Sequence, residues 1–231
     1  GGLMLDCSRT FLEPEYLKRY IDLLAYYKMN RLHLHLTDDQ GWRLESKIYP
    51  RLHKQGSGLE HLSMRKLRAI NKVRFDDQGG RLLGKRFQSF SEVSEMRGYY
   101  TREEMREIVR YAARRHVMVI PEIDVPGHCS ALVAAYAELS CSGKRVEVRE
   151  HRGIYPSALC PGKEEVYEFL DNLLGEVAEL FPAPYLHVGS DEVWGRDWLE
   201  HPLNREILEE RGLEGKEGLH RIRGRLSLGW F

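Results

Sequence analysis

The 231-residue sequence has no net charge, because 35 Lys and Arg balance 35 Asp and Glu. Without an overall field to attract polyanions, neither nucleic acid nor an acidic membrane surface is the expected partner. No apolar run approaches the ~18 residues that span a bilayer, and the first residues lack the basic start and long apolar stretch of a secretory signal. We therefore expect no membrane partner, and the compartment stays open.

Cysteine is scarce, with four residues at irregular spacing and no C-x-x-C pair. This pattern indicates neither a zinc knuckle nor a disulfide scaffold, and the sequence suggests no cofactor. Cys141 and Cys160 could pair in an oxidising compartment, but loop geometry decides whether two thiols can meet. Their pairing is left open.

What the sequence does contain is an alternation of short apolar runs with longer amphipathic segments. The short runs predict strands at residues 2–5, 31–36, 117–123 and 185–189. The amphipathic segments predict helices at 14–28, 101–112 and 166–177, the second of which begins with a capping box at Thr101 and Glu104. Four βα units of this kind are typical of an α/β protein with a parallel sheet.

The number of units limits the architecture. Parallel βα units build either an open sheet or an eight-stranded barrel of typically ~250 residues, and four or five units fall short of closure. A fifth strand is predicted at 226–231, after a partly helical segment at 203–211. Residues 57–97 interrupt the second unit, and we interpret them as a surface insertion within a single domain of residues 1–231, with a basic nucleic-acid patch as the less favoured alternative.

Acidic and imidazole side chains recur where the predicted strands end. They are Asp6, Asp38, Asp39, Glu122, Asp124, His128, Asp191 and Glu192. Because the carboxyl ends of parallel strands share one face of the fold, this recurrence predicts an active site there. Two adjacent carboxylates raise the pKa of one partner, which suits a proton donor beside an ionised group. Alternatively, Asp191 and Glu192 simply begin a helix, whose dipole favours acids.

Two roles are possible for each of three other side chains, which are His33, His35 and Trp42. His33 and His35 point to the same face of a strand, so they could form a metal pair or support the fold by packing, and we favour packing because no further ligands are evident. Trp42 could be a sugar-facing platform, but core packing is favoured.

Four segments carry a resemblance to a known family: 3–9 (LMLDCSR), 33–43 (HLHLTDDQGWR), 121–128 (PEIDVPGH) and 187–193 (HVGSDEV). In sequence and order they resemble the signatures of glycoside hydrolase family 20. The resemblance implies a (β/α)8 TIM barrel, of which this chain holds only the first four to five βα units. It also implies a metal-independent β-N-acetylhexosaminidase that releases terminal β-linked N-acetylglucosamine or N-acetylgalactosamine from oligosaccharides with retention of configuration.

The resemblance also implies roles for individual residues. In such enzymes the sugar's own 2-acetamido oxygen attacks the anomeric carbon, forming an oxazolinium intermediate. Glu192 corresponds to the general acid, Asp191 to the residue that orients the acetamido group, and His128 with Asp38 to the supporting hydrogen-bond network. The candidates for substrate binding are Asp6, Asp124, Trp194 and Trp230.

The sequence departs from the family pattern at both ends. Gly1 stands where the family has an arginine that binds sugar hydroxyls, and of the later acetamido-pocket residues at most Trp230 matches. The chain thus resembles a truncated catalytic domain, whose unpaired strand edges would favour a homodimer. Two alternatives stay open: a metal-dependent amidohydrolase-type barrel built on His33 and His35, and a non-catalytic carbohydrate-binding remnant.

Overall fold

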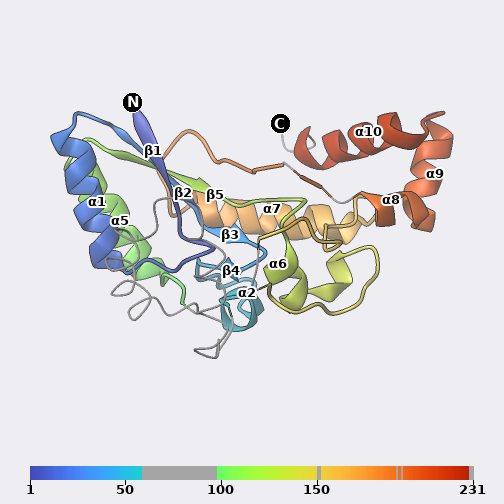
Figure 1. Ribbon diagram of the computed structural model, residues 1–231, viewed down its shortest axis with the longest axis horizontal. Helices are drawn as coiled ribbons and strands as arrows, with labels where there is room; N and C mark the ends of the chain where they lie inside the picture. The colour runs from blue at the N-terminus through green and yellow to red at the C-terminus, as the bar shows by residue number, and fades with distance from the viewer. Residues whose placement is uncertain (59–97, 150–151, 191, 194, 229–231) are drawn as a thin grey trace, which may run out of the picture.

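The computed structural model shows a parallel sheet flanked by helices (Figure 1). It describes residues 1–58, 98–149, 152–190, 192–193 and 195–228. The sheet consists of β1 (Gly2–Asp6), β2 (Arg31–His35) and β5 (Met118–Glu122), in the order β1-β2-β5. All pairs are parallel, with Asp6 opposite His35 and His35 opposite Glu122. The last residues of the three strands therefore form one row at one end of the sheet.

The predicted fourth strand at 185–189 lies next to β5, although it forms only a single bridge, between Glu122 and His187. The backbone N–H of Ile123 donates to the His187 carbonyl at 2.9 Å, and that of Val125 to the Val188 carbonyl at 3.0 Å. The segment thus extends the parallel order by one position, which brings the residues that follow it to the same end of the sheet.

Three amphipathic helices supply much of the core, as predicted. They are α1 (Pro14–Tyr26), α5 (Arg102–Ala113) and α7 (Glu164–Ala178). α1 and α5 lie side by side in Figure 1, and each buries residues at helical spacing, such as Ile21 in α1 and Ile108 in α5. Full burial of an aliphatic side chain contributes about 1.5–3 kcal/mol, so these faces fix the helices to the sheet.

Short elements anchor the loops at the end of the sheet where the acids gather. They are β3 (Thr37–Asp38), β4 (Gly41–Trp42), α2 (Arg51–Gln55), α6 (Ser130–Ala135) and η1 (Ala137–Leu139). Trp42 is buried and its indole N–H donates to the Leu44 carbonyl at 2.7 Å. This confirms the prediction that Trp42 packs in the core. The buried Arg43 guanidinium donates to the carbonyls of Ser8 and Gly98 and so ties three loops together.

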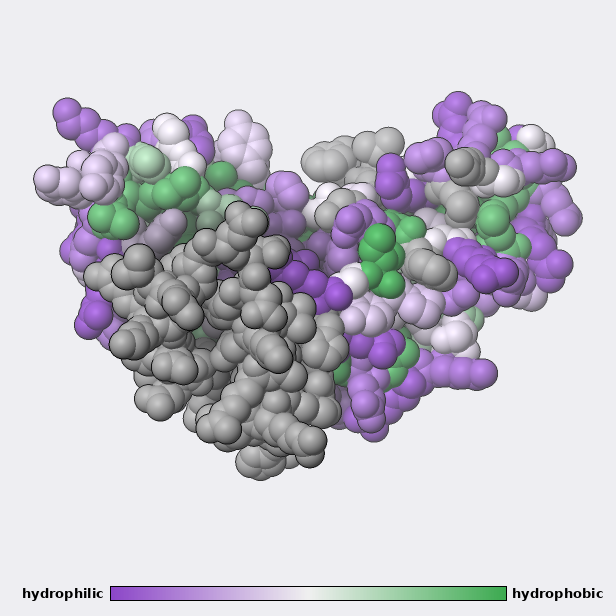
Figure 2. Space-filling view, in the orientation of Figure 1, coloured by the Kyte–Doolittle hydropathy of each residue, from purple (hydrophilic) through white to green (hydrophobic). Residues whose placement is uncertain are grey.

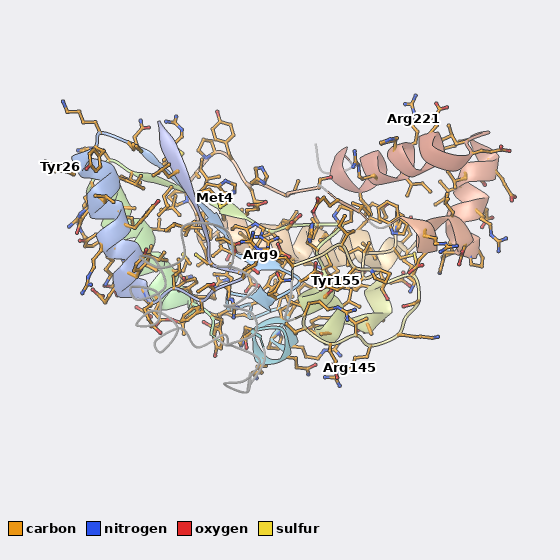
Figure 3. The ribbon with its side chains drawn as sticks, in the orientation of Figure 1. Met4, Arg9, Tyr26, Arg145, Tyr155 and Arg221 are labelled. Atoms are coloured by element: carbon orange, nitrogen blue, oxygen red, sulfur yellow. The ribbon has the colours of Figure 1, made fainter. Side chains whose placement is uncertain are left out.

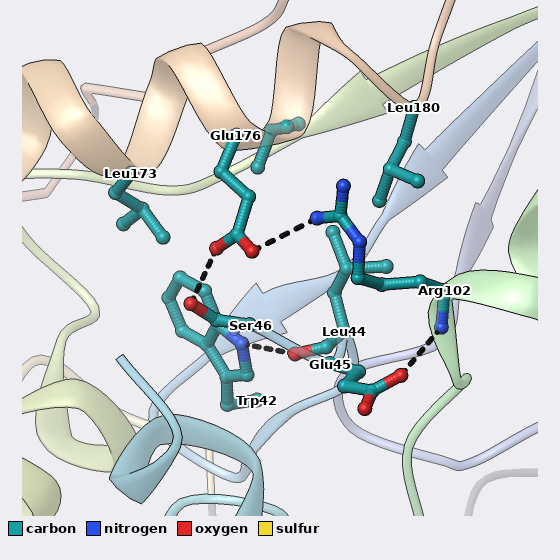
Figure 4. Close-up of a pocket in the computed structure, with 9 residues that line it drawn as sticks. Trp42, Leu44, Glu45, Ser46, Arg102, Leu173, Glu176 and Leu180 are labelled. Atoms are coloured by element: carbon teal, nitrogen blue, oxygen red, sulfur yellow. Dashed lines mark hydrogen bonds and ion pairs between the residues drawn. The ribbon is translucent and has the colours of Figure 1, made fainter. Parts of the chain in front are cut away.

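α7 is joined to α5 by a buried ion pair and to the segment that follows β4 by hydrogen bonds, shown with the surrounding pocket in Figure 4. The Glu176 carboxylate lies 2.9 Å from the Arg102 guanidinium and accepts hydrogen bonds from the Ser46 hydroxyl and the Lys47 N–H. The Glu176 carboxylate therefore has three partners, from α5 and from the segment after β4. This pocket is a structural joint between helices rather than a ligand site.

The C-terminal part is helical, with α8 (Arg196–Glu200), α9 (Pro202–Glu210) and α10 (Gly215–Leu228). The strand predicted at 226–231 is therefore wrong for residues 226–228, which end α10. Ile222 and Leu226 are both buried at a spacing of four, so the helical period prevails over the short alternation of leucines. Residues 229–231 and most of the predicted insertion at 57–97 lie outside the described residues. Among the helices that the structure describes, none combines the length and apolarity of a membrane span.

Candidate active site

The acidic and imidazole side chains predicted from the strand ends do gather at one end of the sheet. Those that the structure describes are Asp6, Asp38, Asp39, Glu122, Asp124, His128 and Glu192. Asp191, Trp194 and Trp230, the other predicted site residues, lie outside the described residues. The chemistry can therefore be built from the part of the site around His128.

His128 connects a solvent-facing carboxylate with two buried ones. Its Nε2 lies 3.3 Å from Glu192 Oε2, while its Nδ1 hydrogen-bonds Asp39 Oδ2 at 2.9 Å and lies 3.4 Å from Asp38 Oδ1. The Glu192 side chain is 58% exposed, whereas both aspartate side chains have no exposed surface. The imidazole thus lies between two buried, negatively charged carboxylates and the exposed carboxylate of Glu192, which a ligand can reach.

Asp39 is the partner of His128 to which the sequence alone assigned no role. Its carboxylate also accepts hydrogen bonds from the N–H and hydroxyl of Ser130 at the start of α6. Only the pairing of these loops in space distinguishes Asp39 from its neighbour Asp38 as the closer partner of the imidazole. Its position in the Asp-Asp pair was the single signal in the sequence.

Asp38 faces several cations and hydrogen-bond donors. His35 Nε2 lies 2.9 Å from its Oδ2, the Arg9 guanidinium forms an ion pair with the same oxygen, and the Asp39 N–H donates to its Oδ1 at 2.6 Å. Burial alone would raise the pKa of Asp38, but hydrogen bonds from His128 and His35 and the charge of Arg9 hold it well below its usual range. Asp38 is thus held ionised.

Arg9 is a second residue to which the sequence assigned no role. It lies near the centre of the molecule in Figure 3, beneath Met4, and joins Asp6 to Asp38. Asp6 accepts from the Arg9 N–H at 2.9 Å and from its guanidinium at 2.8 Å. The predicted substrate-binding Asp6 is therefore connected to the predicted Asp38 network through one guanidinium.

The pKa values of both buried histidines of the site are raised. Hydrogen bonds to Asp38 and Asp39 outweigh burial and raise the pKa of His128 to about 11. For His35, burial lowers the pKa, but Asp38 and Glu122 outweigh it and raise the value to about 10. Both imidazoles therefore carry a positive charge at neutral pH, which compensates the buried carboxylates.

The loop that carries Glu192 has an unusual backbone. Ser190 and Glu192 have φ values of 80° and 39°, and His128 has 49°, in the left-handed region that non-glycine residues rarely adopt. Such conformations cluster at functional sites, where the surrounding structure enforces them. Gly189 is also left-handed, and a Cβ added there would lie 1.9 Å from Asp124 Oδ1. Gly189 therefore allows Asp124 to approach this loop, where its carboxylate accepts from the Ser190 N–H at 3.3 Å.

His33 and His35 both face the Glu122 carboxylate, in agreement with the predicted shared face. His33 Nε2 lies 2.7 Å and His35 Nδ1 2.9 Å from Glu122 Oε2, and His187 Nδ1 lies 3.2 Å from Oε1. These donors and acceptors lie close enough to hold a metal ion, as do those around Asp38. Because the imidazoles and carboxylates already pair with one another, we assign no metal-ligand role to them.

Cys141 and Cys160 are free thiols that lie beside each other. The Asn204 amide is directed toward both, with Nδ2 3.4 Å from Cys141 Sγ and 3.8 Å from Cys160 Sγ. His201 offers a third donor in this group. The two cysteines predicted as a possible pair are thus close in space but not bonded in the structure.

Parallel βα units with carboxylates and an imidazole at the carboxyl ends of the strands are typical of the active-site face of α/β-barrel proteins. The sequence model of glycosyl hydrolase family 20, catalytic domain, matches residues 1–223, and the chain belongs to this family. The fold is accordingly that of the first βα units of a (β/α)8 barrel.

Among curated relatives, the beta-hexosaminidase of Porphyromonas gingivalis is 37% identical over 94% of this chain and 24% of its own length. That of Akkermansia muciniphila is 39% identical over 94% of this chain and 38% of its own length. Among solved structures, the beta-N-acetylhexosaminidase of Bacteroides fragilis superposes with a TM-score of 0.74 at 32% identity, covering 97% of this chain and 38% of that one. The chain thus spans about a quarter to two-fifths of the length of these relatives.

Proposed function

We propose that this chain carries the acid–base part of a β-N-acetylhexosaminidase active site, which hydrolyses terminal β-linked N-acetylhexosamines. The observation that carries the proposal is the contact of His128 with both Glu192 and the buried aspartates. The family and the beta-hexosaminidases among its relatives support it. A Streptomyces plicatus relative, 37% identical and with a TM-score of 0.67, was solved with N-acetylglucosamine as product, which supports the substrate class.

In the proposed reaction Glu192 is the general acid. It donates its proton to the glycosidic oxygen as the bond to the anomeric carbon breaks. The substrate's acetamido carbonyl oxygen forms the new bond to that carbon, giving the oxazolinium ion. Water then attacks the anomeric carbon, which breaks the bond to the acetamido oxygen and regenerates the 2-acetamido group. The water gives up its proton to the Glu192 carboxylate, which restores the acid, and the two displacements leave the configuration retained.

The neighbouring residues have supporting parts. Asp191 precedes Glu192 in the chain, and we assign it to the acetamido N–H, whose growing positive charge an ionised carboxylate stabilises. His128 holds Glu192 by its Nε2 and is itself held by Asp39 and Asp38. A protonated imidazole at this distance stabilises the carboxylate that Glu192 becomes after proton donation.

The second part of the proposal concerns the residues that form the rest of the sugar pocket. Asp6, Asp124, Trp194 and Trp230 are the candidates within this chain, which forms one partial catalytic domain over residues 1–231. Since the relatives are two and a half to four times as long, we infer that later barrel strands complete the pocket. A second copy of this chain is the alternative source of such strands.

Hydrolysis of a chromogenic β-N-acetylglucosaminide by this chain and by Glu192→Gln tests the function. We expect turnover that Glu192→Gln lowers by a factor of at least about 100, because the variant can neither protonate the leaving oxygen nor take the proton of the attacking water. A chelator is the control, and it should leave turnover unchanged. Turnover that survives Glu192→Gln, or that the chelator abolishes, would contradict the proposal. Sugar binding without turnover by the folded chain would favour the non-catalytic remnant.

A further inference from the structure

The contacts of His128 continue inward from the active site through three more residues. From the surface, carboxylates and imidazoles alternate in the order Glu192, His128, Asp38, His35 and Glu122, which we call the carboxylate–imidazole chain. The successive closest distances are 3.3 Å, 3.4 Å, 2.9 Å and 2.9 Å. The residues come from four separate segments of the sequence, so only the fold brings them together.

The inner members of the carboxylate–imidazole chain are buried. Glu122 is 6% exposed, His35 5% and Asp38 1%. A buried charge is tolerated only when paired, and each member is flanked by groups of opposite sign. Arg9 faces Asp38, which also accepts from the backbone N–H of Asp39. Asp6 and Asp124 lie near His35, and His33 and His187 face Glu122.

His35 is the link that depends on Glu122. Both of its ring nitrogens face carboxylate oxygens at 2.9 Å, Nε2 toward Asp38 and Nδ1 toward Glu122. An imidazole donates from both nitrogens only when it is protonated, whereas the neutral ring turns a lone pair toward one of the two carboxylates. The negative charge of Glu122 therefore favours the double donor, which in turn holds the Asp38 oxygen.

Asp38 transmits this constraint to the site. Its Oδ2 is held by His35 and Arg9, which fixes the direction in which Oδ1 faces His128. If His35 became neutral, Asp38 would lose the positive charge that faces its Oδ2 and, in one of the two neutral tautomers, the hydrogen-bond donor as well. Asp38 would then be held less firmly and could rotate away from the imidazole that contacts Glu192. We propose that Glu122 is a positioning residue for the general acid Glu192, acting through His35, Asp38 and His128. The inference deepens the proposed function and rests on it.

The test compares Glu122→Gln with the unchanged chain across pH 5–9. Burial lowers the pKa of His35 whereas its two carboxylate partners raise it, so we expect the loss of one partner to lower the pKa toward this range. Activity of Glu122→Gln should match the parent profile at low pH and fall at least about ten-fold relative to it at high pH, in addition to the loss that the parent shows as its general acid gives up its proton. A loss of the same size at every pH would show a merely structural role and overturn the inference.

Histidine NMR makes the test independent of turnover. In Glu122→Gln, the His35 ring signals should titrate in the neutral range, and the His128 signals should follow with the same midpoint. A His128 ring that does not respond while His35 titrates would overturn the inference, whether or not the chain hydrolyses a substrate. Absent turnover with coupled His signals would instead count against the proposed function alone.

Two variants serve as controls. Glu122→Asp keeps the negative charge and should retain the shape of the parent pH profile. Glu176→Gln removes an equally buried carboxylate, 6% exposed, that pairs with Arg102 and does not belong to the carboxylate–imidazole chain. It should lower stability without introducing a new titration of His128, so an effect seen in both Gln variants would reflect general loosening and overturn the inference.

Discussion

Glu192 is exposed, but the residues that hold it are buried, and His128 is where the two environments meet. The orienting role that we propose for His128 rests on its two nitrogens, one toward Glu192 and one toward Asp39 and Asp38. Groups that orient a reacting side chain are typically worth 10–100-fold in activity when removed, as known for partners of metal ligands. Among single residues, His128 is therefore the one on which the proposed function of Glu192 depends most.

His128→Asn is expected to lower kcat/KM by about 10–100-fold with a substrate whose leaving group is a poor one, because Glu192 then protonates it less effectively. Asn tolerates the left-handed backbone of this position, where φ is 49°. An activated phenolic leaving group needs less protonation, so its hydrolysis should fall less. Equal losses for both substrates would contradict a role in proton transfer.

Gly189→Ala is expected to destabilise the chain by about 2–4 kcal/mol in urea unfolding. The cost combines about 1–2 kcal/mol for a left-handed alanine with a clash against Asp124 Oδ1. Gly143→Ala is the matched control, since Gly143 has nearly the same φ, 62°, but open space around it, and only the backbone cost applies. Equal losses in the two variants would mean that Asp124 does not require this glycine.

Which site residues could be predicted depends on what the sequence shows directly. Acids after each apolar run predicted Asp38, Asp124 and Glu192, because strand ends converge in parallel sheets. Arg9 and the preference of His128 for Asp39 could not be predicted, because both depend on how separate loops fold back over the sheet. The pairing of His35 with Glu122 follows from the register of β2 against β5, which hydrophobic pattern alone does not set between parallel strands.

At the scale of elements, α5 illustrates a local sequence signal that holds in full. Thr101 caps the helix by accepting from the Glu104 N–H, and the Glu104 side chain accepts in return from the Thr101 N–H at 2.8 Å. The helix that follows presents Arg102 to Glu176 of α7. The cap therefore also fixes the start of the joint between α5 and α7.

Thr101→Ala is expected to lower the free energy of unfolding by about 1 kcal/mol, because the N–H groups of the first turn lose their acceptor. Equilibrium unfolding in urea measures the change. Thr101→Ser keeps the hydroxyl and should restore most of the stability. A Ser variant as unstable as the Ala variant would show that the methyl packing of Thr101 matters and the cap does not.

The elements that were predicted less well are those whose identity depends on tertiary contacts. Long periodic segments such as α1, α5 and α7 were predicted within a few residues, because their buried faces repeat several times. The end of α10 contains only three aliphatic residues in a polar segment, Ile222, Leu226 and Leu228. They are too few to distinguish the two-residue period of a strand from the spacing of about four residues in a helix. The segment 185–189 is apolar like a strand, yet it pairs with β5 at one bridge only.

At the scale of the whole molecule, the described part of the chain is a partial barrel with an open edge at β1. Among the described residues β1 pairs only with β2, and Leu3 and Met4 on it are 42% and 53% exposed. Figure 2 shows hydrophobic surface in the same region, near α1 and β1. An unpaired strand with apolar side chains is a template for further pairing.

We therefore expect this chain on its own to associate in a concentration-dependent way, with a dimer among the products. Analytical ultracentrifugation across a hundred-fold concentration range measures it. Met4→Lys places a charge on the open edge and should shift the equilibrium toward monomer. A parent chain that stays monomeric at every concentration would show that the edge is not adhesive, and Tyr26→Lys, on exposed α1, is the control for added charge alone.

In the proposed function, Glu192 and its supporting network serve a retaining reaction in which the substrate's acetamido group is the nucleophile. The most direct measurement is proton NMR of the first sugar released from a β-N-acetylglucosaminide, recorded before mutarotation. We expect the β-anomer, because two successive inversions at the anomeric carbon retain the configuration. Release of the α-anomer would show a single displacement by water and would contradict this expectation.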